Sequence, residues 1–120
     1  MTPFGAKLRE LRAQRGISLK QMAADLQLSP AYLSALEHGR RGRPSPVLLI
    51  QICQYFHRIW DDAEELERLA QLSHPRVTVD TSGLEPEATE LANLLAERIH
   101  DIDPALVRRM LALLKGTAKE

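Results

Sequence analysis

Three arginines stand close together in a short segment that also contains glycine and proline. Residues 40–44, directly after Gly39, read Arg-Arg-Gly-Arg-Pro. Each guanidinium offers a fork of N–H donors that matches two phosphate oxygens, and glycine allows a backbone to approach a ligand closely. This pattern predicts contact with a polyanion, although a loop of this kind is also often simply solvated. The candidates for phosphate contact are Arg40, Arg41 and Arg43.

The overall charge hides an uneven distribution along the chain. The 120 residues include 16 Lys plus Arg and 16 Asp plus Glu, so the net charge is zero. Residues 1–60 hold nine basic and three acidic side chains, a net charge of +6, whereas residues 61–120 hold seven and thirteen, a net charge of −6. We therefore expect only the first half to approach nucleic acid.

A second group of residues has the types needed for acid–base or metal chemistry. Four acids between residues 61 and 65 follow His57 closely. Acids that open a helix interact favourably with its dipole, and neither a nucleophile nor metal-ligand spacing accompanies these. We therefore expect no enzymatic activity, no cofactor and no metal site.

Length and composition set further limits. A chain of 120 residues suits one compact domain with a short accessory segment. Its single cysteine, Cys53, excludes an internal disulfide, and the chain has neither a membrane-spanning apolar run nor a signal peptide. We expect a soluble, cytoplasmic protein.

Capping signals mark where helices begin. A side chain that accepts hydrogen bonds satisfies free N–H groups in the first turn, and proline's fixed φ suits the first helical position. Ser18, with Gln21 three residues later, predicts another start in the form of a capping box. A fifth helix is expected to begin near Asp61 or Asp62. The starts that combine a cap with proline are Thr2-Pro3, Ser29-Pro30, Ser45-Pro46 and Asp103-Pro104.

Apolar residues recur at helical spacing behind these starts, so five helices should share one core within residues 1–73. Residues 74–84 break the pattern with Pro75 and with alternating Val77 and Val79, which suits a linker or a short strand. Two more amphipathic, leucine-rich helices are predicted at about 85–100 and 104–115.

The second and third predicted helices are separated by only a tight turn at residues 27–29, a spacing typical of two helices that cross steeply. This segment resembles the Cro and phage-repressor (Xre-like) helix-turn-helix family, and the resemblance covers roughly residues 4–73. It implies an all-α fold: a five-helix, lambda-repressor-like domain, followed by a linker and two C-terminal helices. The residues that carry the resemblance are Ser18, Gln21, Ala23, Leu26, Leu28, Ser29, Leu33, Ser34, Leu36, Glu37 and Gly39.

The resemblance implies that the helix after Ser29 enters the major groove of DNA. That helix lacks the Arg, Asn or Gln that makes bidentate contacts to guanine or adenine. Specificity should then depend on thymine methyls, on Tyr32 and on DNA shape. The candidates for base reading are Pro30, Ala31, Tyr32, Ser34, Ala35 and His38. Further candidates for phosphate contact are Lys20, Gln21 and Ser29.

Glu37 requires a cationic partner, because an unpaired carboxylate at an apolar helix end is costly. The resemblance points to Arg12, with two independent solvated charges as the alternative.

Two residues depart from the family pattern. Gln27 replaces the usual turn glycine, which implies mild strain in the left-handed region, and Leu19 replaces a phosphate-contacting glutamine.

The sequence therefore predicts a helix-turn-helix DNA-binding domain at 1–73, a linker or short strand at 74–84, and a helical dimerisation segment at 85–120. Surplus leucines in the last segment predict a homodimer, with packing on the first domain as the alternative. We expect a sequence-specific transcriptional regulator, a repressor that binds double-stranded DNA as a homodimer on a palindromic operator, with no small-molecule ligand evident. The alternative is an antitoxin that also represses its own operon.

Overall fold

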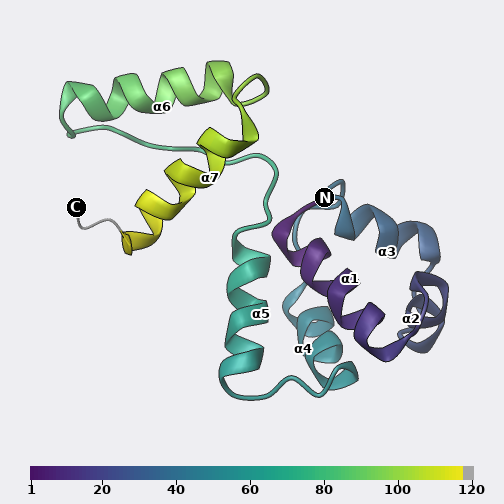
Figure 1. Cartoon of the computed structure of the whole chain (residues 1–120). Helices are drawn as coiled ribbons and strands as arrows, with labels where there is room; N and C mark the ends of the chain where they lie inside the picture. The colour runs from purple at the N-terminus through teal and green to yellow at the C-terminus, as the bar shows by residue number, and fades with distance from the viewer. Residues whose placement is uncertain (118–120) are drawn as a thin grey trace. The chain divides into compact units, whose positions relative to one another are not determined.

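The computed structural model describes residues 1–117, and every regular element among them is a helix (Figure 1). The chain forms two compact units, Met1–Val77 and Thr78–Glu120; residues 118–120 of the second lie outside the described part. The prediction of an all-α fold with five helices followed by two more is confirmed. The elements are α1 (Pro3–Arg15), α2 (Leu19–Asp25), α3 (Pro30–Glu37), α4 (Pro46–Tyr55), α5 (Asp61–Gln71), α6 (Pro86–Arg98) and α7 (Pro104–Ala112).

The predicted capped helix starts are confirmed. The hydroxyls of Thr2, Ser18, Ser29 and Ser45 each accept a hydrogen bond from the amide three residues later. Asp103 caps α7 by accepting from the Ala105 amide at 3.0 Å. The reciprocal half of the expected capping box does not form, because the Gln21 amide nitrogen donates to Asp25 Oδ1 at 2.8 Å instead.

The core of the first unit is assembled from the apolar faces of all five helices. α1 contacts α2, α3 and α5, and α4 contacts α5. Leu72 follows the last residue of α5 and is 51% exposed. The buried apolar residues are Phe4, Leu8, Leu11, Met22, Ala23, Leu33, Leu36, Leu48, Ile52, Cys53, Phe56, Leu66 and Ala70.

The segment expected to be a linker or a short strand contains no strand: residues 74–84 are irregular, with bends and one turn. The boundary between the two compact units, after Val77, falls within it. No residue from 74 to 80 is buried.

The second unit consists of two helices joined by a short loop, and it has little interior. Neither α6 nor α7 contains a buried residue. The two helices border a groove of about 430 Å³, whose lining includes Leu91, Leu94, Leu95 and Leu106. After α7 the chain makes a π-helical turn, Leu113–Thr117, in which Gly116 has a φ of 80°.

None of the helices within residues 1–117 combines the length and apolar character required to cross a membrane.

Candidate nucleic-acid interface

α2 and α3 are joined by a turn whose hydrogen bonds hold it in one conformation. The Leu28 amide donates to the Ala23 carbonyl at 2.8 Å, and the Gln27 amide donates to the Ala24 carbonyl at 3.1 Å. These two bonds define a Schellman motif, which requires a left-handed residue after the helix. Gln27 takes that position with a φ of 59°, as its place in the turn predicted. Ser29 then starts α3 by accepting from the Tyr32 amide at 3.0 Å.

α3 buries one side and leaves the other accessible. Leu33, Leu36 and Glu37 are buried in the first unit. The predicted base-reading residues fall on the remaining surface, where Pro30, Ala31 and His38 are exposed and Tyr32, Ser34 and Ala35 are half-buried. The accessible face of α3 is therefore made mainly of small side chains, with Tyr32 and His38 as its larger polar groups.

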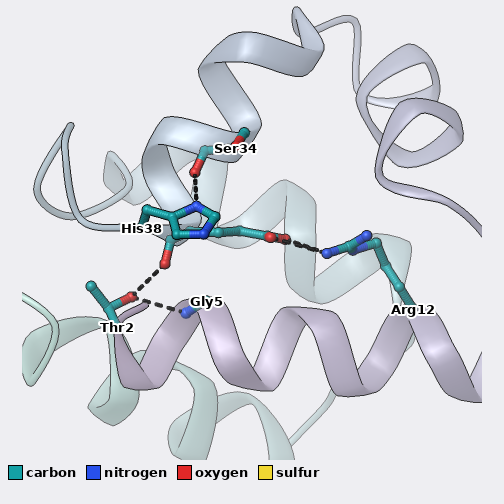
Figure 2. Close-up of polar contacts among 6 residues, drawn as sticks. Thr2, Gly5, Arg12, Ser34 and His38 are labelled. Carbon is teal, nitrogen blue, oxygen red and sulfur yellow. Dashed lines mark hydrogen bonds and ion pairs between the residues drawn. The ribbon is translucent and has the colours of Figure 1, made fainter.

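His38 lies at the end of α3 with its ring fixed against the helix. Its Nδ1 is 2.9 Å from the Ser34 carbonyl (Figure 2). Because a carbonyl oxygen only accepts, Nδ1 carries the proton in this contact, and Nε2 is left for solvent or a ligand.

The three arginines that follow α3 are exposed. No carboxylate of residues 1–117 lies within 4.0 Å of any of their guanidinium groups. The Arg41 guanidinium lies 5.5 Å from the centre of the Tyr32 ring, within the range of a cation–π contact. Among the described residues these cations therefore have no counterion to leave when a polyanion approaches.

The remaining phosphate candidates lie at the start of α2. Lys20 and Gln21 are both exposed. The Gln21 side chain is directed by Asp25, which also accepts a hydrogen bond from the Tyr55 hydroxyl at 2.6 Å. Burial, then the hydrogen bond and charge of Asp25, raise the pKa of Tyr55 to about 12. Tyr55 thus remains protonated and ties α4 to the C-terminal end of α2.

A buried ion pair joins α1 to the end of α3. Arg12 Nη2 lies 3.0 Å from both carboxylate oxygens of Glu37 (Figure 2). Glu37 is 0% exposed and Arg12 is 8% exposed. Burial raises the pKa of Glu37, and the Arg12 guanidinium opposes that shift. The predicted partners therefore lie together, in a place where each needs the other.

A close contact between the start of α1 and the end of α3 was not foreseen from the sequence. The Glu37 carbonyl accepts from the Thr2 hydroxyl at 3.2 Å (Figure 2). It also accepts from the Thr2 amide at 3.1 Å. Gly5 lies directly beneath, and a methyl group there would collide with the Glu37 carbonyl. The sequence predicts Thr2 as a helix cap, but nothing in the sequence near Thr2 predicts its contact with the Glu37 carbonyl.

Ser73 is a second residue that the sequence did not reveal. Its hydroxyl accepts from the Phe4 amide at 2.8 Å and donates to the Leu69 carbonyl at 2.6 Å. It is 3% exposed, so the Phe4 amide at the start of α1 is satisfied from the end of α5. Thr2 therefore holds the start of α1 against the end of α3, and Ser73 holds it against the end of α5.

The acids near His57 belong to a helix start and to surface ion pairs. Asp61, Asp62 and Glu64 occupy the first turn of α5. Glu65 lies 3.7 Å from Arg58 and 3.9 Å from Lys7. Within residues 1–117, no group of three or more His, Cys, Asp or Glu side chains is arranged to hold a metal ion.

A family model described as a helix-turn-helix domain matches residues 3–69, from the first residue of α1 into α5. Curated relatives match as well. RghRB of Bacillus subtilis, an uncharacterized HTH-type transcriptional regulator, is 43% identical over 49 residues, which are 41% of this chain and 35% of that protein. RghR of Bacillus subtilis, an HTH-type transcriptional repressor, is 35% identical over 54 residues, 45% of this chain and 40% of that protein.

DdrOP3 of Deinococcus deserti, an HTH-type transcriptional regulator, is 35% identical over 100 residues, 83% of this chain and 65% of that protein. A match of that length extends beyond the 77 residues of the first unit. The chain spans less than two thirds of the length of each of these three relatives. No solved structure matches the chain significantly.

Proposed function

This chain belongs to the helix-turn-helix domain family, and on that premise we propose that it binds double-stranded DNA sequence-specifically and regulates transcription. The observation that carries the proposal is the junction at the end of α3. A helix with an accessible face of small side chains leads directly into three arginines without internal counterions. A groove about 12 Å wide admits such a helix, and phosphates flank that groove on both sides.

The loop arginines supply the affinity that does not depend on sequence. Arg40 and Arg43 are exposed and free of carboxylates, so each one offers a forked donor to a phosphate. Lys20 and Gln21, with Ser29 at the start of α3, add contacts to the backbone of the duplex. Leu19 offers no such contact, which leaves a larger share of the affinity to the arginine loop.

Base reading falls to the accessible face of α3. Ala31 and Ala35 are suited to thymine methyl groups, and Tyr32, Ser34 and His38 carry the polar groups. Pro30 stands at the first helical position, where it adds apolar surface. With so few polar side chains, part of the specificity rests on DNA shape.

The second unit supports a homodimer through residues 85–120. Five leucines on the two helices are between 38% and 63% exposed, and together they form a large apolar surface for two helices of this length. A second copy covers that surface, and its twofold axis places two α3 helices on a palindromic site, about 34 Å apart. The five leucines are Leu91, Leu94, Leu95, Leu106 and Leu111.

The direction of regulation that we propose is repression, in the cytoplasm. One relative is named a repressor and the two others are named regulators. A dimer held on an operator excludes other proteins from the same stretch of DNA, and this exclusion is enough to repress transcription.

The test has two stages. Genome-wide mapping of bound DNA supplies a motif, and binding to a duplex with that motif is then measured over a range of salt concentrations. Replacing Arg40 and Arg43 with Ala should weaken binding to all duplexes alike and flatten the slope of log K against log salt by about one for each lost phosphate contact.

Arg68→Ala is the matched control, because Arg68 is an exposed arginine on α5 whose side chain donates to Gln71. The salt slope of this variant should equal that of the parent protein. If the purified chain ignored every duplex at low salt, including fragments from its own promoter, the proposal would be abandoned.

A further inference from the structure

The accessible face of α3 lacks the side chains that discriminate best between base pairs. Bidentate contacts to guanine come from Arg or Lys, and those to adenine come from Asn or Gln. The helix Pro30–Glu37 has the sequence PAYLSALE, which includes none of these four residue types. Bidentate reading of a guanine or an adenine therefore requires a side chain that reaches the same surface from another element.

Arg41 is the side chain that lies on this surface. Its guanidinium carbon is 5.5 Å from the centre of the Tyr32 ring, and Tyr32 is the third residue of α3. The first residues of a recognition helix are those that approach base edges. Arg41 follows α3 by four positions, so it reaches back along the helix to its N-terminal part.

The backbone around Arg41 is turned back by hydrogen bonds. The Arg40 amide donates to the Ala35 carbonyl at 2.9 Å, and the Gly42 amide donates to the Gly39 carbonyl at 3.3 Å. Gly39 and Gly42 have φ values of 83° and 73°, which other residues rarely adopt. Arg41 is therefore carried by a turn between two left-handed glycines, directed toward Tyr32.

We propose that Arg41 reads a guanine in the major groove through its forked N–H donors, with Tyr32 as the residue that positions it. This assignment rests on the proposed DNA binding and replaces the phosphate contact that the sequence predicted for Arg41. The guanidinium lies over the ring, and this cation–π contact uses none of its N–H donors, which leaves them for guanine O6 and N7. Because the cation is already held, less conformational entropy is lost when the contact forms.

Arg40 and Arg43 differ from Arg41 because they lack a contact with an aromatic ring. No aromatic ring among residues 1–117 lies under either of their guanidinium groups. They share the exposure and the loop of Arg41, so they are its natural controls.

The experiment is selection of bound duplexes from a randomised library by the full chain, followed by affinity measurements on single-base variants of the selected site. The parent protein should require a G·C pair at one position of each half-site. Arg41→Ala should remove that preference, which amounts to a loss of roughly tenfold or more in discrimination at that position alone.

Arg41→Lys separates base reading from charge, because lysine keeps the charge and lacks the fork. It should relax the preference while leaving the salt slope unchanged. Arg43→Lys and Arg43→Ala are the matched controls: both should retain the G·C preference, and only the second should reduce the salt slope.

Tyr32 is tested by a conservative and a disruptive change. Tyr32→Phe keeps the ring and should retain the preference at the Arg41 position, whereas Tyr32→Leu removes the ring and should weaken the preference there. Because Tyr32 packs against the core, helical content and thermal unfolding of both variants are measured first.

The proposal is overturned if Arg41→Ala weakens binding to all sequences equally and reduces the salt slope by about one, since that result identifies a phosphate contact. It is also overturned if Arg41→Ala selects the same sites as the parent protein. Failure of the parent protein to bind any duplex refutes the proposed DNA binding itself, and is a different result from these two.

Discussion

The carboxylate of Glu37 shows how one residue links the core to the candidate interface. Its side chain is 0% exposed, and its charge is compensated by Arg12 at 3.0 Å. Its carbonyl binds Thr2, so both ends of the residue hold α1 to the end of α3. A buried pair of this kind adds little net stability, yet removal of one partner leaves an uncompensated buried charge.

Arg12→Met should therefore destabilise the protein by about 3–5 kcal/mol. The double variant Arg12→Met, Glu37→Leu should recover most of that loss, because it leaves no buried charge. Denaturant unfolding of the four proteins in the cycle measures the coupling. Simple additivity of the two changes would contradict it.

The pH gives an independent check on the same variant. Burial raises the pKa of Glu37, and the charge of Arg12 opposes that rise. In Arg12→Met no other group compensates the buried charge of the Glu37 carboxylate as strongly. The loss of stability in this variant should therefore be largest near neutral pH, and it should shrink as the carboxyl takes up a proton on acidification. The matched control is Arg58→Met with Glu65→Leu, a surface pair at 3.7 Å with Glu65 52% exposed, whose coupling should be at most about 1 kcal/mol.

At the scale of elements, the first four helices end in the same way. After α1, α2, α3 and α4 the chain turns through a left-handed residue that is followed by an amide bonded back into the helix. Glycine takes this position after α1 and α3, as Gly16 and Gly39. After α2 and α4 the position is taken by Gln27 and His57, with φ values of 59° and 55°. Two of the four turns thus carry a strained residue.

Gln27→Gly should stabilise the protein by about 0.5–1 kcal/mol, because relief of left-handed strain outweighs the added flexibility of glycine in the unfolded chain. Gln14→Gly is the matched control: the same change at an exposed position inside α1 should destabilise by about 1 kcal/mol. Midpoints of denaturant unfolding at constant slope report both. Equal signs for the two variants would refute the assignment of strain to residue 27.

The whole molecule consists of two units with different amounts of core. The first unit buries side chains from five helices, whereas α6 and α7 bury none. Two helices whose leucines are exposed gain most of their stability from burial of those leucines against another surface. In the proposed dimer that surface is the α6–α7 pair of a second copy. The dimer also has twice as many contacts to DNA as one copy, which strengthens binding.

The full chain should sediment as a dimer, and a chain shortened to end at Val77 should sediment as a folded monomer that binds its site more weakly. The end point keeps Ser73, whose hydroxyl satisfies the Phe4 amide. Full-chain Leu94→Asp is the companion variant, because it disrupts the apolar groove without removing residues, and it should also be monomeric. If the full chain is monomeric at all concentrations, the proposal that residues 85–120 form a dimer interface is wrong.

Much of this protein was predictable because its signals are local. Capping residues and prolines set the helix starts through groups within three residues of each other, and periodic apolar residues set the buried faces. The arginine loop was evident for the same reason, whereas the left-handed conformation of Gln27 was implied by the resemblance to a family. The partner of Glu37 came only from the resemblance to a family, since Arg12 lies 25 residues away.

The tertiary structure alone decided the contacts that join distant residues. Ser73 reaches Phe4 across 69 positions, and Gly5 is required only because the end of α3 happens to lie against it. The position of the Arg41 guanidinium over the Tyr32 ring depends on how the loop turns after α3, which no short pattern specifies. Local chemistry fixes where helices start and stop, whereas packing decides which side chains they bring together.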